Sequence, residues 1–146
     1  MTLQNLLAIQ RLLAFEPSRD DVQRLLAAAE RNLVDSAVDA ISAENRFDAA
    51  YKCVMQCAMA ALWANGYRTS TSQPGHHQTA IQTLTLTIGL DGQTVAVLDT
   101  LRKQRNISDY SGDPISPSSV EECARQAQAL LKTVQRWLVD RRPDLS

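Results

Sequence analysis

The chain has 146 residues, which suits one ordinary domain that buries roughly two-thirds of its unfolded surface. Hydrophobic residues make up 45% of the sequence, which excludes an intrinsically disordered chain. The formal net charge is −1, from 15 basic and 16 acidic residues. This balance argues against non-specific nucleic-acid binding by the whole surface, because such binding needs a cationic field, but it allows a local basic patch.

The first residues do not resemble a secretory signal, because glutamine, asparagine and arginine interrupt their apolar character. No stretch approaches the ~20 consecutive apolar residues that span a bilayer. The three cysteines, Cys53, Cys57 and Cys123, are far fewer than small disulfide scaffolds carry. We therefore expect reduced thiols, a cytoplasmic location and no membrane association.

A short N-terminal helix or arm is predicted for residues 1–17. Apolar residues recur at helical spacing from Leu3 to Phe15, and Pro17 ends the pattern. Ser18 then offers an N-cap for a long helix with acidic residues in its first turn. The apolar stripe of this helix continues for about six turns. It consists of Val22, Leu25, Leu26, Ala29, Leu33, Ala37, Ala40 and Ile41.

A second helix is predicted from Phe47 to Asn65, followed by Gly66, where a left-handed residue commonly ends a helix. Its stripe is rich in alanine and cysteine, which lets a neighbouring helix approach closely. Cys53 and Cys57 lie one turn apart in that stripe, a spacing that also suits two metal ligands. A zinc site needs four ligands, and the other plausible donors, Cys123 and the two histidines, do not form a pair with a known zinc spacing, so we favour core packing and predict no metal site.

The next region is polar from Tyr67 to Gly75 and predicts a loop. Thr83 to Leu90, with the sequence TLTLTIGL, alternates with the period of a strand, yet Ile81, Leu84 and Ile88 also share one helical face. Because an isolated strand would have no partner elsewhere in the chain, we predict a third helix here.

A fourth helix is predicted from about Gln93 to Asp109. Arg105 follows Leu98 by seven residues, which is two turns, so we expect it to face the other helices. A loop then leads to a last helix, capped by Ser116 or Ser118, and to a tail at residues 143–146. These elements predict an all-α fold, an up-and-down bundle of four to five helices over residues 18–142.

The segment LRKQRNISDY, residues 101–110, carries the most informative chemistry. Arg102 and Lys103 lie near a helix C-terminus, where the helix dipole favours cations, and charge complementarity alone explains them. Arg105 faces inward, so its guanidinium needs a partner, and an acidic residue of the second helix such as Asp48 would supply it. A structural ion pair and a functional arginine have the same sequence signature.

Three segments occur in a characteristic order: RFDAAYKCVMQCAMAALWANG, then GHHQTAIQTL, then RKQRN…DY. The first has an acidic residue, Asp48, near its start, is rich in alanine and ends at a glycine, and the second has two histidines directly after its first glycine. The third resembles a motif of arginine, a polar residue and, four to six residues on, a histidine. Together, over about residues 19–140, they resemble the HEPN domains of prokaryotic toxin and defence systems.

This resemblance implies a homodimer with a cognate antitoxin or nucleotidyltransferase partner, and metal-independent RNA cleavage without a cofactor in active members. Arg105 and Asn106 match the first two motif positions, and Tyr110, after Asp109, stands where the histidine is expected. The family arginine binds the phosphate and its histidine transfers protons. A phenol with an ordinary pKa of about 10 is a poor general base, although it donates a hydrogen bond to phosphate.

His76 and His77, at the start of the third helix, are an alternative source of the missing imidazole, and exposed or capping histidines are the other interpretation. Arg102, Lys103, Asp109 and Asp48 are the further binding candidates. Two functions are therefore favoured, and a small-molecule or nucleotide sensor, for which the sequence has no motif, is the third interpretation. One is an RNA- or nucleotide-binding HEPN-like protein with endoribonuclease activity, and the other is a non-catalytic dimerisation or partner-binding module.

Overall fold

The computed structural model describes residues 1–146, and 69% of them are helical, which confirms the predicted all-α fold. Four helices of 17 to 25 residues dominate it: α2 (Arg19–Asp35), α3 (Ala43–Ala64), α6 (Gly92–Ser111) and α7 (Pro117–Arg141). Three short helices accompany them: α1 (Leu3–Ala8), α4 (His76–Gln82) and α5 (Leu84–Thr87). None of the helices combines the length and the apolar character that a membrane span requires.

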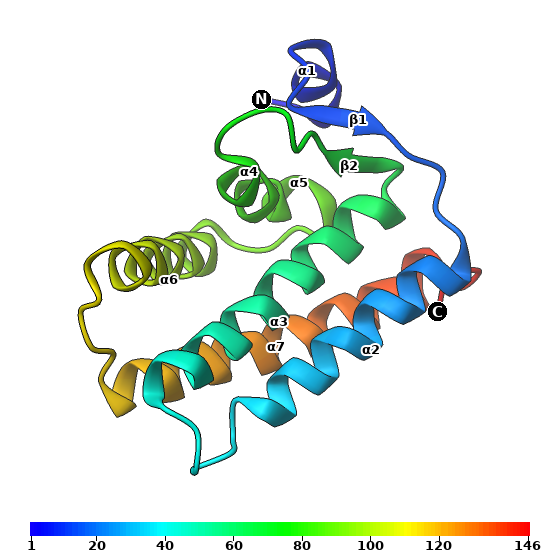
Figure 1. Ribbon diagram of the computed structural model, residues 1–146. Coiled ribbons are helices and arrows are strands. Elements are labelled where there is room, and N and C mark those ends of the chain that lie inside the picture. Colours follow the sequence, from blue (N-terminus) through cyan, green and yellow to red (C-terminus); the bar gives the residue numbers. More distant parts are fainter.

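Helix α3 is the centre of the bundle (Figure 1), with α2 and α7 packed along it and α4, α5 and α6 contacting it from another side. The ends of α3 and α7 show that these two helices run in the same direction. Glu44, at the start of α3, accepts a hydrogen bond from the Ile115 amide just before α7, and Arg142, after α7, donates to the Ala64 carbonyl. Since α2 and α6 run the opposite way, directions alternate along the chain, as predicted for an up-and-down bundle.

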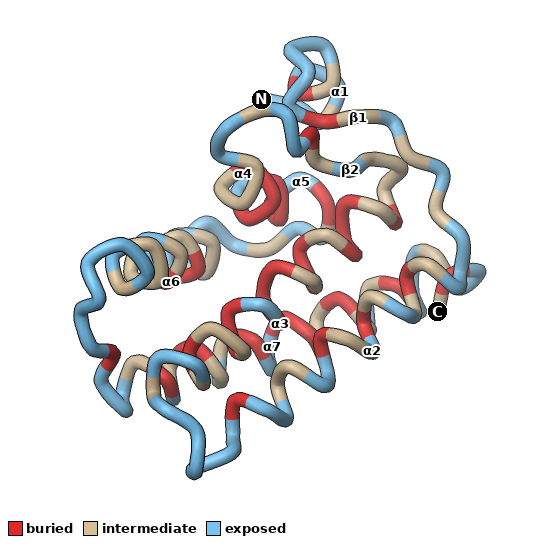
Figure 2. Tube along the Cα trace, viewed as in Figure 1, coloured by how far each residue is buried: buried red, intermediate tan, exposed pale blue.

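Small residues explain the central place of α3. Ala50, Cys53, Cys57 and Ala61 are all buried, and α3 has the longest buried face in Figure 2. Short side chains let α2 and α7 approach its backbone, so that burial is gained without bulky residues. All three cysteines are buried free thiols, as the core-packing interpretation predicted.

Helix α2 begins as predicted, because the Ser18 hydroxyl accepts a hydrogen bond from the Asp21 amide at 3.1 Å. Its predicted continuation through Ala37, Ala40 and Ile41 is wrong, since the helix ends at Asp35 and these residues are exposed. The Ser36 hydroxyl donates to the Leu33 carbonyl at 2.6 Å. Short polar side chains of this kind bind the local backbone and favour turns over helix, which an apolar stripe does not show.

A two-stranded antiparallel sheet joins the N-terminal segment to the end of α3. Strand β1 (Leu12–Ala14) pairs with β2 (Tyr67–Thr69), with Leu13 opposite Arg68. The predicted loop at Tyr67–Gly75 is therefore wrong at its first three residues. The short N-terminal helix predicted as one of two alternatives is confirmed over Leu3–Ala8, but a strand that was not predicted follows it. Because the partners lie more than fifty residues apart, local periodicity cannot show this pairing.

Other boundaries also differ from the sequence prediction, and α3 begins at Ala43, four residues before the predicted start at Phe47. The TLTLTIGL stretch is helical in α5, as predicted, but a break at Thr83 separates it from α4, and Ile88 to Leu90 lie outside any helix. The Thr83 hydroxyl donates to the Ala80 carbonyl at 2.9 Å in this break. The predicted tail is also part of the fold, because Leu145 is buried and its carbonyl accepts a hydrogen bond from Gln23 of α2.

Candidate functional site

Arg105 lies on the inner side of α6, as its spacing from the buried Leu98 predicts. Its Nε atom is 3.4 Å from Oδ1 of Asp48 on α3 and 3.1 Å from Oδ2 of Asp109, one turn further along α6. The guanidinium carbon lies 5.3 Å from the centre of the Tyr51 ring. The predicted pairing with Asp48 is thus confirmed, and the ring of Tyr51 provides a second support through a cation–π contact.

Tyr51 connects Arg105 to the histidines. Its hydroxyl lies 3.2 Å from Nδ1 of His77, at the start of α4. The His76 ring stands edge-on to the His77 ring, with their centres 4.6 Å apart. One of the two histidines considered as a source of the missing imidazole therefore shares a contact residue with Arg105. We refer to His76, His77, Tyr51, Arg102 and Arg105 as the Tyr51 cluster.

Burial shifts the ionisation of this cluster. It raises the pKa of Tyr51 to about 12, so the phenol keeps its proton at neutral pH. Burial also lowers the pKa of His77, and the positive charges of His76, Arg105 and Arg102 lower it further. Both groups are therefore neutral at physiological pH, which leaves the arginines as the fixed positive charges of the cluster.

Arg102 is anchored in the same way one turn earlier on α6. Its Nε donates to Oδ1 of Asp99 at 2.8 Å, and Lys103 reaches the other oxygen of that carboxylate at 3.5 Å. The hydrogen bond from Arg102 holds the pKa of Asp99 below its usual value. The side chain of Arg102 is only 14% exposed, so this is an ordered pair and not a solvated surface charge.

The terminal nitrogens of both arginines are unused by the protein. Every side-chain hydrogen bond of Arg102 and Arg105 is made through Nε, and their Nη atoms have no hydrogen-bond partner in the protein. An arginine fixed through Nε can still offer terminal nitrogens to a phosphate or carboxylate oxygen. Anchoring and ligand binding are therefore compatible in these two side chains.

The cleft beside Arg105 does not suit an anion. A small cleft of about 170 Å³ lies there, lined in part by Glu44, Asp48 and Asp109. Three carboxylates around one guanidinium repel a phosphate. This cleft is therefore unsuited to a phosphate.

The predicted motif residues do not form one site. Arg105 and Asp109 share one face of α6, whereas Asn106 and Tyr110 share the neighbouring face, because a helix turns about 100° per residue. Tyr110 is 91% exposed and, like Asn106, makes no hydrogen bond through its side chain. The structure thus brings Arg105 together with Asp48 and His77 and leaves Tyr110 apart from them.

Tyr51 and Asp99 are site residues that sequence reasoning missed. Tyr51 lies three residues after Asp48, so the two side chains share a face of α3, and this spacing is the available signal. Asp99 precedes Arg102 by three residues, which predicts a helical ion pair. Both spacings are local and common in helices. Neither one indicates by itself that Tyr51 of α3 and the Asp99–Arg102 pair of α6 belong to the same site.

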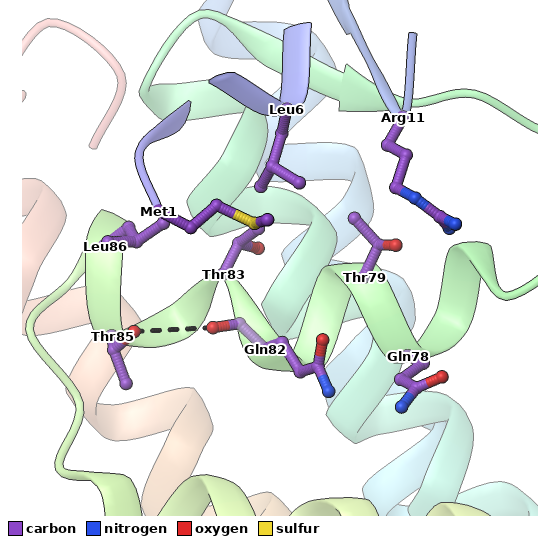
Figure 3. A pocket seen from close by; sticks show the side chains of 9 residues that line it. All are labelled: Met1, Leu6, Arg11, Gln78, Thr79, Gln82, Thr83, Thr85 and Leu86. Carbon is purple, nitrogen blue, oxygen red and sulfur yellow. Dashed lines mark hydrogen bonds between the residues drawn. The ribbon is translucent and has the colours of Figure 1, made fainter. Parts of the chain in front are cut away.

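A separate cavity of about 510 Å³ lies between the N-terminal segment and α4–α5 (Figure 3). Gln78 and Gln82 of α4 line one wall, together with threonine side chains, and Arg11 is its one charged residue. No group of three or more histidine, cysteine or acidic residues is placed to hold a metal ion anywhere in the chain. The Tyr51 cluster is therefore the site where charged and titratable side chains converge.

Comparison of the chain with protein-family models, with curated protein sequences and with solved structures finds no match.

Proposed function

We propose that this chain is a HEPN-like protein of a prokaryotic toxin–antitoxin or defence system that binds RNA or nucleotide phosphates at the Tyr51 cluster. One observation carries the phosphate-binding part. Arg102 and Arg105 are each held through Nε, and their terminal nitrogens have no hydrogen-bond partner in the protein. Such preorganised guanidinium groups bind phosphate oxygens with little loss of side-chain entropy.

The HEPN-like part of the proposal rests on the order of elements and on one contact. An acidic residue early in α3, Asp48, faces the arginine of the RKQRN…DY stretch on α6, Arg105. In its catalytic form the proposal is a metal-independent endoribonuclease without a cofactor, in which Arg105 stabilises the phosphate. It acts in the cytoplasm as a homodimer, with a cognate antitoxin or nucleotidyltransferase as partner.

Binding of a fluorescently labelled single-stranded RNA, measured by polarisation, tests this proposal. Arg105→Ala should weaken binding about tenfold or more, the effect of losing a hydrogen bond to a charged group. Arg125→Ala is the matched control, because Arg125 is an exposed arginine of α7 paired with Glu122. Circular dichroism must show that both variants remain folded. Equal RNA affinity of the wild type and folded Arg105→Ala would refute the role of Arg105.

The second candidate function is a non-catalytic module that dimerises or binds a partner through the outer face of α6. Two side chains on that face are strongly exposed for their type, Ile107 at 57% and Tyr110 at 91%. Ile107 also lines a groove of about 370 Å³ that continues to Pro114 and Ile115. Exposed apolar residues beside a groove are typical of an interface.

Analytical ultracentrifugation distinguishes this candidate. A second copy of the chain on the outer face of α6 gives a dimer at micromolar concentration, and the pair of substitutions Ile107→Ser and Tyr110→Ser should dissociate it. The same double variant should keep its RNA affinity if the Tyr51 cluster alone binds phosphate. A wild-type monomer at micromolar concentration would count against the dimerisation module.

A further inference from the structure

The hydroxyl group of Tyr51 has one hydrogen-bond partner. The side chain is 1% exposed, and the only hydrogen bond of its oxygen is to Nδ1 of His77, at 3.2 Å. A buried hydroxyl whose hydrogen finds no acceptor costs free energy comparable to a lost hydrogen bond. Which of the two groups donates this hydrogen bond therefore depends on which atom is free to accept it.

A nitrogen of neutral imidazole either carries a hydrogen or accepts one. If Nδ1 of His77 carried the hydrogen, it would donate to the tyrosine oxygen, and the phenol hydrogen of Tyr51 would have no acceptor in the buried site. If Nδ1 is bare, the phenol donates to it, so that the buried phenol hydrogen has an acceptor and Nδ1 has a donor. The second arrangement places the imidazole hydrogen on Nε2, which makes no hydrogen bond to the protein.

We propose that Tyr51 is a positioning residue that holds His77 as the neutral Nε2–H tautomer, so that His77 offers the ligand a hydrogen-bond donor and no base. This inference rests on the proposed phosphate site and narrows it. Nδ1 is occupied by the phenol and Nε2 carries a hydrogen, so neither nitrogen can remove a proton from a ribose hydroxyl. The site then binds acceptor-only oxyanions such as phosphate, and His77 takes no part in RNA cleavage.

The charges around His77 support the neutral form. His76 lies beside it on α4, and α6 contributes Arg102 and Arg105, whose positive charges all oppose protonation of His77. From α3, Asp48 is neutralised by Arg105 and Lys52, and on α6 Asp99 is neutralised by Arg102 and Lys103. No unpaired carboxylate therefore faces His77 to stabilise an imidazolium.

The tautomer is directly measurable, because the chain contains only two histidines. In ¹⁵N-labelled His76→Gln protein, a long-range ¹H–¹⁵N spectrum at pH 7.5 reports His77 alone. We expect a bare Nδ1 and a protonated Nε2. Tyr51→Phe removes the hydroxyl and keeps the ring under Arg105, so the Nδ1 resonance should move and the pKa of His77 should rise. Tyr67→Phe, at a tyrosine of β2 without a side-chain hydrogen bond, should change neither.

Three outcomes would overturn the inference. They are an Nδ1–H tautomer, an imidazolium at pH 7.5, and a Tyr51→Phe spectrum identical to that of Tyr67→Phe. RNA cleavage that His77→Gln slows tenfold would overturn it as well. Titration with inorganic phosphate and with single-stranded RNA tests the proposed function separately. If His77 has the expected Nε2–H tautomer but its resonances do not shift when phosphate or RNA is added, phosphate binding is refuted and the role of Tyr51 remains supported.

Discussion

The contact between Asp48 and Arg105 lends itself to a double-mutant cycle, because one side chain comes from α3 and the other from α6. At 3.4 Å and an effective dielectric constant of about 20, two unit charges attract by about 5 kcal/mol, an upper bound before desolvation. The side chains are 32% and 26% exposed, between a surface pair and a buried one. Lys52 also reaches Asp48, at 3.5 Å, and shares the attraction.

We therefore expect a coupling free energy of about 1 kcal/mol, at the upper end of exposed pairs and well below the cost of breaking a buried one. Arg105→Ala alone should lower the free energy of unfolding by about 2 kcal/mol, because it also removes the contact with the Tyr51 ring. Asp48→Ala should cost less, since Asp109 still pairs with Arg105. Urea denaturation of wild type, both single variants and the double variant gives the four values required.

A substitution of Asp48 also tests ligand binding separately from stability. Asp48→Asn keeps the shape of the side chain and removes a negative charge near the phosphate site. RNA affinity should then rise about threefold, the effect of one unit charge removed at about 6 Å in a solvent-like dielectric. Strictly additive single-mutant effects would refute the ion pair as a stabilising contact. Unchanged or weakened RNA binding by Asp48→Asn would refute the electrostatic reasoning about the site.

Three further outcomes follow from the fold. Leu98→Ala should lower the free energy of unfolding by about 2–5 kcal/mol in urea denaturation, because Leu98 is fully buried between α6 and the rest of the bundle. Ser18→Ala should cost about 0.5–2 kcal/mol in the same assay, through the loss of the α2 cap. Stability should fall as the pH drops below about 6.5, because the folded pKa of His77 lies below the unfolded value and the unfolded chain binds the proton first. Thermal melts should show that His77→Gln flattens this part of the pH profile, and a His77→Gln profile identical to that of the wild type would contradict it.

The sequence predicted the long helices well because their information is local. Ser18 and Ser116 cap α2 and α7 as expected, and the predicted stripe of α7 is buried from Val120 to Leu138 except at Ala124, whereas the stripe of α2 is buried at Val22, Leu26 and Ala29. The failures occur where tertiary contacts decide. The strands at Leu12–Ala14 and Tyr67–Thr69 exist because each supplies the backbone partners of the other. Neither three-residue segment carries a signal of its own.

For the site, spacing predicted the inward direction of Arg105 and made Asp48 a reasonable partner. It did not indicate Tyr51, because one aromatic residue in an alanine-rich helix is most simply a core residue. Nor did it separate Tyr110 from Arg105. Five positions along a helix correspond to about 140° of rotation, and linear proximity hides that difference. The motif residues are therefore contiguous in the sequence, but in the structure Arg105 and Tyr110 lie on different faces of α6.

The net charge of −1 makes a final prediction about how RNA would bind. A chain without a general cationic field attracts RNA only where cations have free hydrogen-bond donors, and in the Tyr51 cluster these are Arg102 and Arg105. Two phosphate contacts on a single strand give a slope of about −1.4 in a plot of log affinity against log salt concentration. A broad basic surface would give a slope several times steeper. Polarisation titrations across a range of salt concentrations measure this slope, and Arg105→Ala should reduce it by about half. A steep slope that Arg105→Ala leaves unchanged would place RNA elsewhere on the molecule and remove the site from the function.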